Sequence, residues 1–114
     1  MEKRVQALTK LINYEGDLED IRKAVSSFSW DSDCEVVTLE RRHCIHTLDK
    51  YLKGEISESD VEDWANLIEC REDIGFESGY SSSLEKCIYE LANPTLATPI
   101  SMDTAKSWKS LLKV

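Results

Sequence analysis

Two histidines and two cysteines lie close together in the sequence and are the residues best suited to binding a metal ion. His43 and His46 are three residues apart, Cys44 lies between them, and Cys34 precedes them. A structural zinc site needs a second ligand pair at a fixed spacing elsewhere. The chain contains no Cys-x-x-Cys or His-x-x-x-His sequence. We therefore expect no bound metal or other cofactor, and we expect both histidines on the surface.

Three acidic residues, Asp31, Asp33 and Glu35, have the spacing that opens a calcium-binding loop. An EF-hand also requires glycine at the sixth loop position and glutamate at the twelfth. Counted from Asp31, those positions hold Val36 and Arg42. The acidic run is therefore interpreted as a turn before the next helix.

The residue types needed for catalysis are present, but no catalytic arrangement is recognisable. The sequence has no Gly-x-Ser-x-Gly turn and no glycine-rich phosphate loop. Glu58 and Glu62 could form a carboxylate pair, but a solvated helix face does not tune such a pair for acid–base catalysis. We therefore expect a protein that is not an enzyme.

Charge is concentrated between Glu55 and Glu77. This segment contains nine acidic residues and one basic residue, whereas the remaining sequence contains thirteen of each. The net charge of −8 therefore arises from one stretch of the chain. Arg41, Arg42 and the lysines near the C-terminus are isolated in the sequence, so no basic footprint for direct nucleic-acid binding is evident.

The acidic segment is expected to form a surface that binds a basic protein partner. Like charges at i, i+4, such as Glu58 and Glu62, slightly destabilise a helix, so their accumulation suggests a use. Leu67 lies off the apolar stripe, and an exposed apolar residue among acids suits an interface. Simple solubility is the alternative explanation. The expected partner-binding residues are Glu58, Asp60, Glu62, Asp63, Asn66, Leu67, Glu69, Glu72 and Asp73, with Trp30 and Tyr80 as aromatic anchors.

The elements that must position this surface are helices. Apolar residues recur at helical spacing, most clearly from Val61 to Ile68, and Ser57 with Asp60 forms a capping box before them. No strand alternation is evident, and residues 72–83 form the longest irregular segment. Helices are expected over residues 2–14 and 58–71, and after caps at Asp17, Thr38, Ser82 and Ser101.

The whole chain, residues 1–114, is expected to be one all-α domain, a compact bundle of five to six short helices. The link of about four residues before Glu58 predicts an antiparallel helix hairpin at its centre. No segment approaches the ~20 apolar residues that span a bilayer, and the N-terminus lacks a signal-peptide apolar region. We therefore expect a cytoplasmic protein with reduced, mostly buried thiols at Cys34, Cys44, Cys70 and Cys87.

The passage LDKYLKGEISESDVEDW, from Leu48 to Trp64, resembles the helix hairpin of small helical bacterial immunity proteins. The similar proteins are those of the colicin D type and of contact-dependent growth inhibition systems. The resemblance implies that the chain binds a cognate nuclease toxin, often one that cleaves tRNA. It implies that carboxylates standing in for phosphates cover the toxin's basic cleft. The matching positions would be Glu58, Asp60, Glu62, Asp63, Glu69, Glu72 and Asp73. An interaction or regulatory module with an unrelated partner is the alternative.

Overall fold

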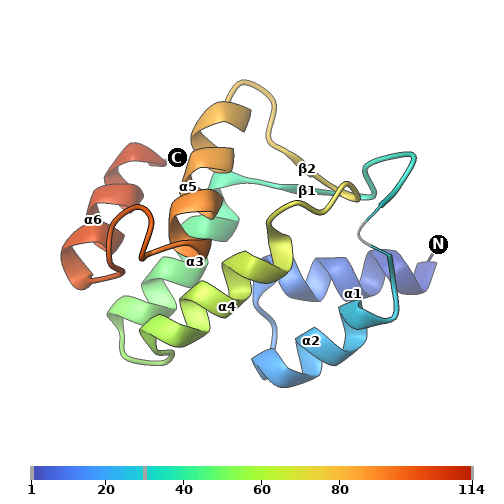
Figure 1. Ribbon diagram of the computed structural model, residues 1–114, viewed down its shortest axis with the longest axis horizontal. Helices are drawn as coiled ribbons and strands as arrows, with labels where there is room; N and C mark the ends of the chain where they lie inside the picture. Colours follow the sequence, from blue (N-terminus) through green and yellow to red (C-terminus); the bar gives the residue numbers. More distant parts are fainter. Residues whose placement is uncertain (1, 30, 114) are drawn as a thin grey trace.

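The structure is a computed structural model that describes residues 2–29 and 31–113 (Figure 1). Within these residues the mostly helical class predicted from the sequence is confirmed, and no helix has the length and apolar character needed to cross a membrane. In chain order the elements are α1 (Glu2–Asn13), α2 (Leu18–Ser26), β1 (Val37–Leu39), α3 (Arg41–Leu52), α4 (Glu58–Ile68), β2 (Ile74–Phe76), α5 (Ser81–Ala92) and α6 (Met102–Leu111).

The two strands form a small parallel sheet that the sequence did not predict (Figure 1). Val37 pairs with Ile74, and Leu39 pairs with Phe76. Strands of three residues are too short to show the alternation of apolar and polar residues that reveals a strand in a sequence. The pairing gives the first part of the 72–83 segment, expected to be irregular, a fixed path beside β1.

The start of α3 differs from the prediction because of this sheet. Thr38 pairs with Gly75 inside β1, so it is not the helix cap. The cap is Glu40, which forms a capping box with His43. The strand takes the residues before Glu40, and the helix therefore begins at Arg41 rather than directly after Thr38.

Of the other four predicted helix caps, three are confirmed and one is wrong. Asp17 accepts a hydrogen bond from the Glu19 N–H, and Ser57 and Ser101 each form a capping box at the start of α4 and α6. The predicted cap at Ser82 is wrong, because α5 begins at Ser81 after Tyr80, with no side-chain cap. Three consecutive serines made the start of this helix ambiguous in the sequence.

The core is organised around Trp64, which is fully buried on α4. Its indole Nε1 donates a hydrogen bond of 2.7 Å to the carbonyl oxygen of Leu11 on α1. Helix α4 packs chiefly against α5, while α3 packs chiefly against α6 and α1 packs against α2 (Figure 1). The most extensive packing between two helices is therefore that of α4 on α5. A central antiparallel hairpin of α3 and α4 remains a prediction.

Candidate functional site

The acidic segment is divided among several places in the fold and does not form the single helix face that the sequence suggested. Among the described residues, four of its carboxylates form ion pairs within the chain. The pairs are Glu55 with Lys50, Asp63 with Arg22, Asp73 with Arg4 and Arg71, and Glu77 with Arg41. Much of the negative charge is therefore neutralised locally, and only part of it is available to another molecule.

Asp73 is fully buried, so its assignment to the partner-binding surface is wrong. The carboxylate accepts hydrogen bonds from Arg71 Nε at 2.9 Å and from Arg4 Nε at 3.0 Å. Burial alone would raise the pKa of Asp73, but the hydrogen bonds and positive charges of Arg71 and Arg4 outweigh it and lower that pKa. The backbone carbonyl of Asp73 also accepts the N–H of Val36, so this residue anchors the loop before β1.

Tyr80 is 41% exposed, but its ring is already engaged by the protein itself. The guanidinium of Arg41 lies 3.7 Å from the ring centroid, a cation–π contact. The same guanidinium binds both carboxylate oxygens of Glu77 at 3.1 Å. Hydrogen bonding from Arg41 lowers the pKa of Glu77. The ring of Tyr80 therefore helps to hold Arg41 and Glu77 in place at the start of α3. Trp30, the other expected aromatic anchor, lies outside the described residues.

The outward side of α4 carries Glu62, Asp63 and Asn66, at the three- and four-residue spacing of one helix face. Asn66 is exposed, whereas Leu67 is half-buried and packs against the core, so the exposed leucine expected among the acids is not present. Asp60 is partly used as the capping-box acid of α4, where its carboxylate accepts the Ser57 N–H at 2.9 Å.

Negative potential from the side of α4 facing α2 reaches Tyr14. Burial, together with the negative charges of Asp60, Asp17 and Asp63, raises the pKa of Tyr14 to about 12. Arg22 lies beside this group, with its guanidinium 3.4 Å from Asp63. The carboxylates on this side are thus clustered, and one of them is balanced by an internal cation.

The most open acidic feature is a hollow between α4 and the segment that joins α5 to α6. We call it the acidic hollow, and its volume is about 370 Å³. Glu58 and Glu62 lie on its helical side, and Pro94 and Pro99 lie opposite. Glu58 accepts a hydrogen bond of 3.3 Å from the Tyr51 hydroxyl, and Glu62 has no ion pair or hydrogen bond to any described residue. Two carboxylates thus face solvent beside apolar walls.

Glu69 and Glu72 lie away from the rim of this hollow and have partners of their own. Glu69 accepts a hydrogen bond of 3.0 Å from the amide of Asn93, which ties the end of α4 to the end of α5. Glu72 is exposed and accepts the N–H of Ser32 at 3.2 Å. These two acids help to hold loops in place, and neither adds to the acidic hollow.

His43 is buried, at 2% exposure, so the expectation that both histidines lie on the surface is wrong for this residue. Its Nδ1 accepts the N–H of Glu40 at 2.8 Å, which completes the capping box of α3. Burial, helped by the charge of Arg42, lowers the pKa of His43 to about 4. His46 is exposed, and no group of three or more possible ligands for a metal ion occurs in the described part of the chain.

The cysteines also differ from the expectation that most are buried. Cys44 and Cys87 are buried, whereas Cys34 and Cys70 are exposed, and all four are free thiols. Hydrogen bonding between the two buried thiols, together with burial, raises the pKa of Cys87. The buried pair therefore behaves as core side chains rather than as reactive thiolates.

A basic surface that the sequence does not reveal, because its residues lie far apart along the chain, is present between α3 and α6. Four basic side chains line one hollow of about 470 Å³ between α3 and α6, and Lys106 lies in an adjoining hollow. Two members have internal partners, since Arg42 pairs with Glu40 and Lys109 pairs with Asp49. The four-residue spacings of Arg42 with His46 and of Lys109 with Lys113 were visible in the sequence, but the packing of α3 on α6 was not. The four side chains are Arg42, His46, Lys109 and Lys113.

Comparison with known proteins adds no relative. No protein-family model matches the chain, and neither a curated protein nor a solved structure shows significant similarity to it.

Proposed function

We propose that this chain is a non-enzymatic inhibitor that binds a basic protein partner, a bacterial nuclease toxin, through the acidic hollow. One observation carries the proposal: Glu58 and Glu62 stand beside apolar walls on an open surface, and Glu62 has no ion pair or hydrogen bond to a described residue. Carboxylates with an apolar border complement the basic cleft of an enzyme that binds a phosphate backbone. The inhibitor would act in the cytoplasm, where such a toxin meets its substrate.

The proposal is supported by the contrast between this hollow and the other acids. Asp73 and Glu77 are held by arginines, and Asp63 is balanced by Arg22. A carboxylate already paired inside its own chain gains little from a partner's lysine or arginine. The contribution to binding is therefore expected to come mainly from Glu58 and Glu62, with Asn66 adding a neutral polar contact on the same helix.

The test is a double charge reversal, Glu58→Lys with Glu62→Lys. The affinity of this variant is measured for the protein encoded by the gene next to that of this chain, prepared in a catalytically inactive form. Titration calorimetry should show affinity lowered by at least about 100-fold, because two desolvated pairs become repulsive. The matched control is Glu15→Lys with Asp20→Lys, which changes the net charge equally at exposed acids near α2. Equal binding by the wild type and the acidic-hollow variant would refute the proposal.

The alternative, an interaction module with an unrelated partner, is favoured by the basic surface between α3 and α6. That surface would attract an acidic molecule, not a basic toxin. The double variant Lys106→Glu with Lys113→Glu reverses two charges of this surface and leaves the Arg42–Glu40 and Lys109–Asp49 ion pairs intact. Loss of partner binding in this variant, with binding retained in the acidic-hollow variant, would favour the alternative.

A further inference from the structure

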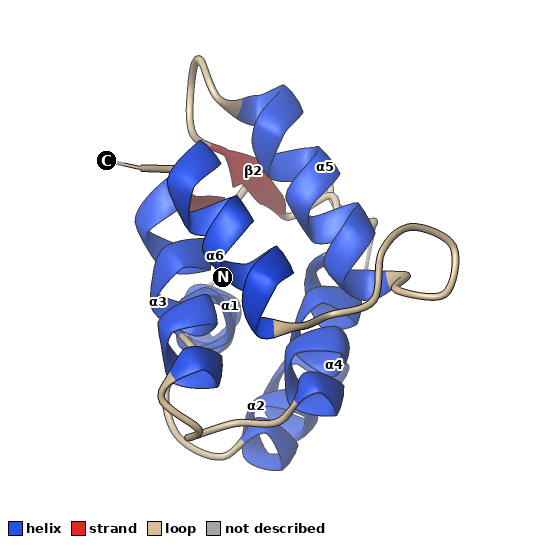
Figure 2. Ribbon diagram, turned by 90° about the vertical axis from the view of Figure 1, so that its left-hand side faces the viewer, coloured by secondary structure: helices blue, strands red, loops and turns tan. Residues whose placement is uncertain are grey.

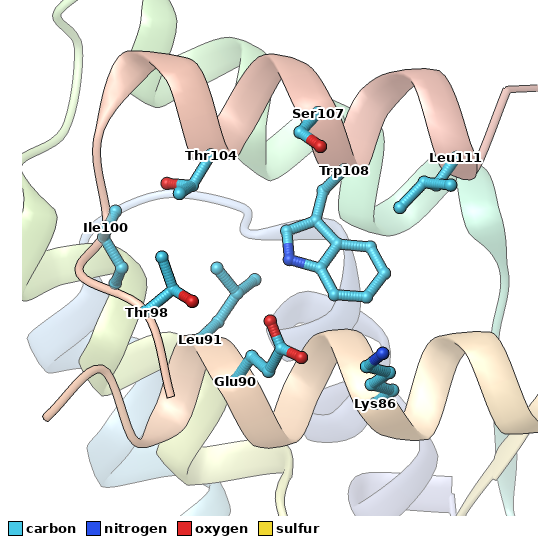
Figure 3. A pocket seen from close by; sticks show the side chains of 9 residues that line it. All are labelled: Lys86, Glu90, Leu91, Thr98, Ile100, Thr104, Ser107, Trp108 and Leu111. Atoms are coloured by element: carbon cyan, nitrogen blue, oxygen red, sulfur yellow. The ribbon is translucent and has the colours of Figure 1, made fainter. Parts of the chain in front are cut away.

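A second hollow lies directly beyond the acidic hollow, between α5 and α6. We call it the Trp108 groove, and its volume is about 270 Å³ (Figure 3). Because α6 packs on α3 rather than closely on α5, the two helices leave a groove that Leu91 and Trp108 only partly fill. Pockets for small molecules usually measure ~300–1,000 Å³. This groove is therefore better matched to one inserted side chain and a short length of backbone.

The floor of the groove contains a hydrogen-bond donor without an acceptor. Trp108 is about nine-tenths buried, at 9% exposure, yet its indole Nε1 has no partner among the described residues. Figure 3 shows the nitrogen-bearing edge of the ring directed to the side of the groove where Thr98 and Leu91 lie. The nitrogen is not among the fully buried polar atoms that lack a partner, so it meets solvent in the groove. An indole N–H presented to an open groove can donate to a carbonyl oxygen of a docked molecule.

The charge on the walls of the groove is arranged along its length. Glu90 and Lys86 both extend from α5, and neither has an ion pair within the described chain (Figure 3). Ile100 lines both the Trp108 groove and the acidic hollow, so the two features adjoin each other at this residue. Glu90 therefore adds a third carboxylate to Glu58 and Glu62 along one path, while Lys86 marks a positively charged side of the groove.

Exposed apolar side chains are concentrated in the part of the chain that forms the groove, and one of them, Leu111, lines it. Four of the five large exposed hydrophobic residues of the described chain belong to the segment from α5 to α6. The loop between these helices projects from the body of the protein (Figure 2), and Leu96 in it is 75% exposed. Apolar groups of this kind around a partly filled pocket are typical of a protein-binding surface. The four residues are Tyr89, Leu96, Met102 and Leu111.

We propose that the Trp108 groove binds an extended segment of the basic partner in which a large aliphatic side chain adjoins an arginine or lysine. The aliphatic side chain lies against Leu91 and Leu111, and a backbone carbonyl of the segment accepts the indole N–H of Trp108. The basic side chain lies against Glu90, which is nearer than Lys86 to the end of the groove where Ile100 adjoins the acidic hollow (Figure 3). This inference rests on the proposed function for the sign of the partner's charge.

The probe is a display library of random short peptides, selected on the immobilised full-length chain. We expect the selected peptides to share a leucine, isoleucine or methionine beside an arginine or lysine. Their affinity should fall at least about tenfold in Glu90→Lys and in Leu111→Ser, both changes on the surface of the helices. Glu85→Lys is the matched control, because Glu85 is an exposed acid of the same helix that does not line the groove.

Nuclear magnetic resonance gives a second readout at the indole itself. The Trp108 indole N–H signal, assigned by its absence in Trp108→Phe, should shift when a selected peptide is added. The Trp64 signal should stay in place, because that N–H is buried and bonded to Leu11. Peptides without the expected pattern, an unmoved Trp108 signal, or equal effects of Glu90→Lys and Glu85→Lys would overturn the inference.

The two proposals can fail separately. If Glu58→Lys with Glu62→Lys abolishes partner binding but Glu90→Lys does not, the acidic hollow is the binding surface and the groove inference is wrong. If peptide selection and the Trp108 signal behave as expected while the acidic-hollow variant binds its partner normally, the groove stands and the proposed function through the acidic hollow is wrong.

Discussion

At the scale of single residues, the most consequential carboxylate is one that no partner can reach. Asp73→Asn removes the carboxylate charge that pairs with the buried guanidinium of Arg71, and breaking such a pair typically costs about 3–5 kcal/mol. We expect urea denaturation to show a loss of this size in the free energy of unfolding. Glu72→Gln, at an exposed neighbour, should cost far less. A loss below about 1 kcal/mol for Asp73→Asn would contradict a structural role for the pair.

His43 makes stability depend on pH in a defined window. The folded chain protonates this histidine only near pH 4, because burial lowers its pKa from 6.5 to about 4. Between these values the unfolded chain binds more protons, so the free energy of unfolding falls as pH falls from 6.5 towards 4, by up to about 3 kcal/mol. Below pH 4 both states are protonated and the fall from this group stops. Urea titrations at a series of pH values measure the effect.

The matched variants for this pH dependence are His43→Gln and His46→Gln. Glutamine at position 43 can still accept the Glu40 N–H as the third residue of the helix, but it does not titrate. The slope of stability between pH 6.5 and pH 4 should therefore become shallower in His43→Gln and stay unchanged in His46→Gln, which alters an exposed side chain. The same slope in all three proteins would mean that other groups cause it.

At the scale of elements, the capping boxes decide where α4 and α6 begin. Ser57→Ala removes the acceptor of the Asp60 N–H, and loss of such a cap costs about 1 kcal/mol. Ser82→Ala should change stability by less than about 0.5 kcal/mol, because Ser82 lies inside α5 and caps nothing. Thermal denaturation of the two variants distinguishes them, and a larger loss for Ser82→Ala would show that this serine does cap α5.

The elements also show why some boundaries could not be predicted. Caps with a side-chain oxygen and a nearby apolar stripe, as at Asp17, Ser57 and Ser101, are local and were found correctly. The predicted end of α4, at residue 71, is too late, because Glu69 already has an extended ψ of 134° and Cys70 then turns the chain in a left-handed conformation with φ of 68°. Glycine usually signals such a stop. A cysteine there carries no signal in the sequence.

At the scale of the whole molecule, the helical class and much of the core followed from apolar spacing, but the charged surfaces did not. A linear count of charge placed eight net negative charges in one stretch and treated the basic residues as isolated. Folding buries Asp73, pairs several other acids, and brings basic residues of α3 and α6 around one hollow. These outcomes depend on which helices meet, which local spacing does not encode.

The resulting charge distribution predicts how association with a basic partner depends on salt. Screening lengths fall from about 30 Å at 0.01 M to about 3 Å at 1 M ionic strength, so attraction by the acidic hollow acts over a distance only at low salt. Stopped-flow measurement should show the association rate falling at least about tenfold across this range, with a much smaller change in the dissociation rate. Glu58→Lys with Glu62→Lys should flatten this dependence, whereas Glu15→Lys with Asp20→Lys should largely preserve it. A rate that is independent of salt in the wild type would mean that apolar contacts alone, such as those at the Trp108 groove, drive the encounter.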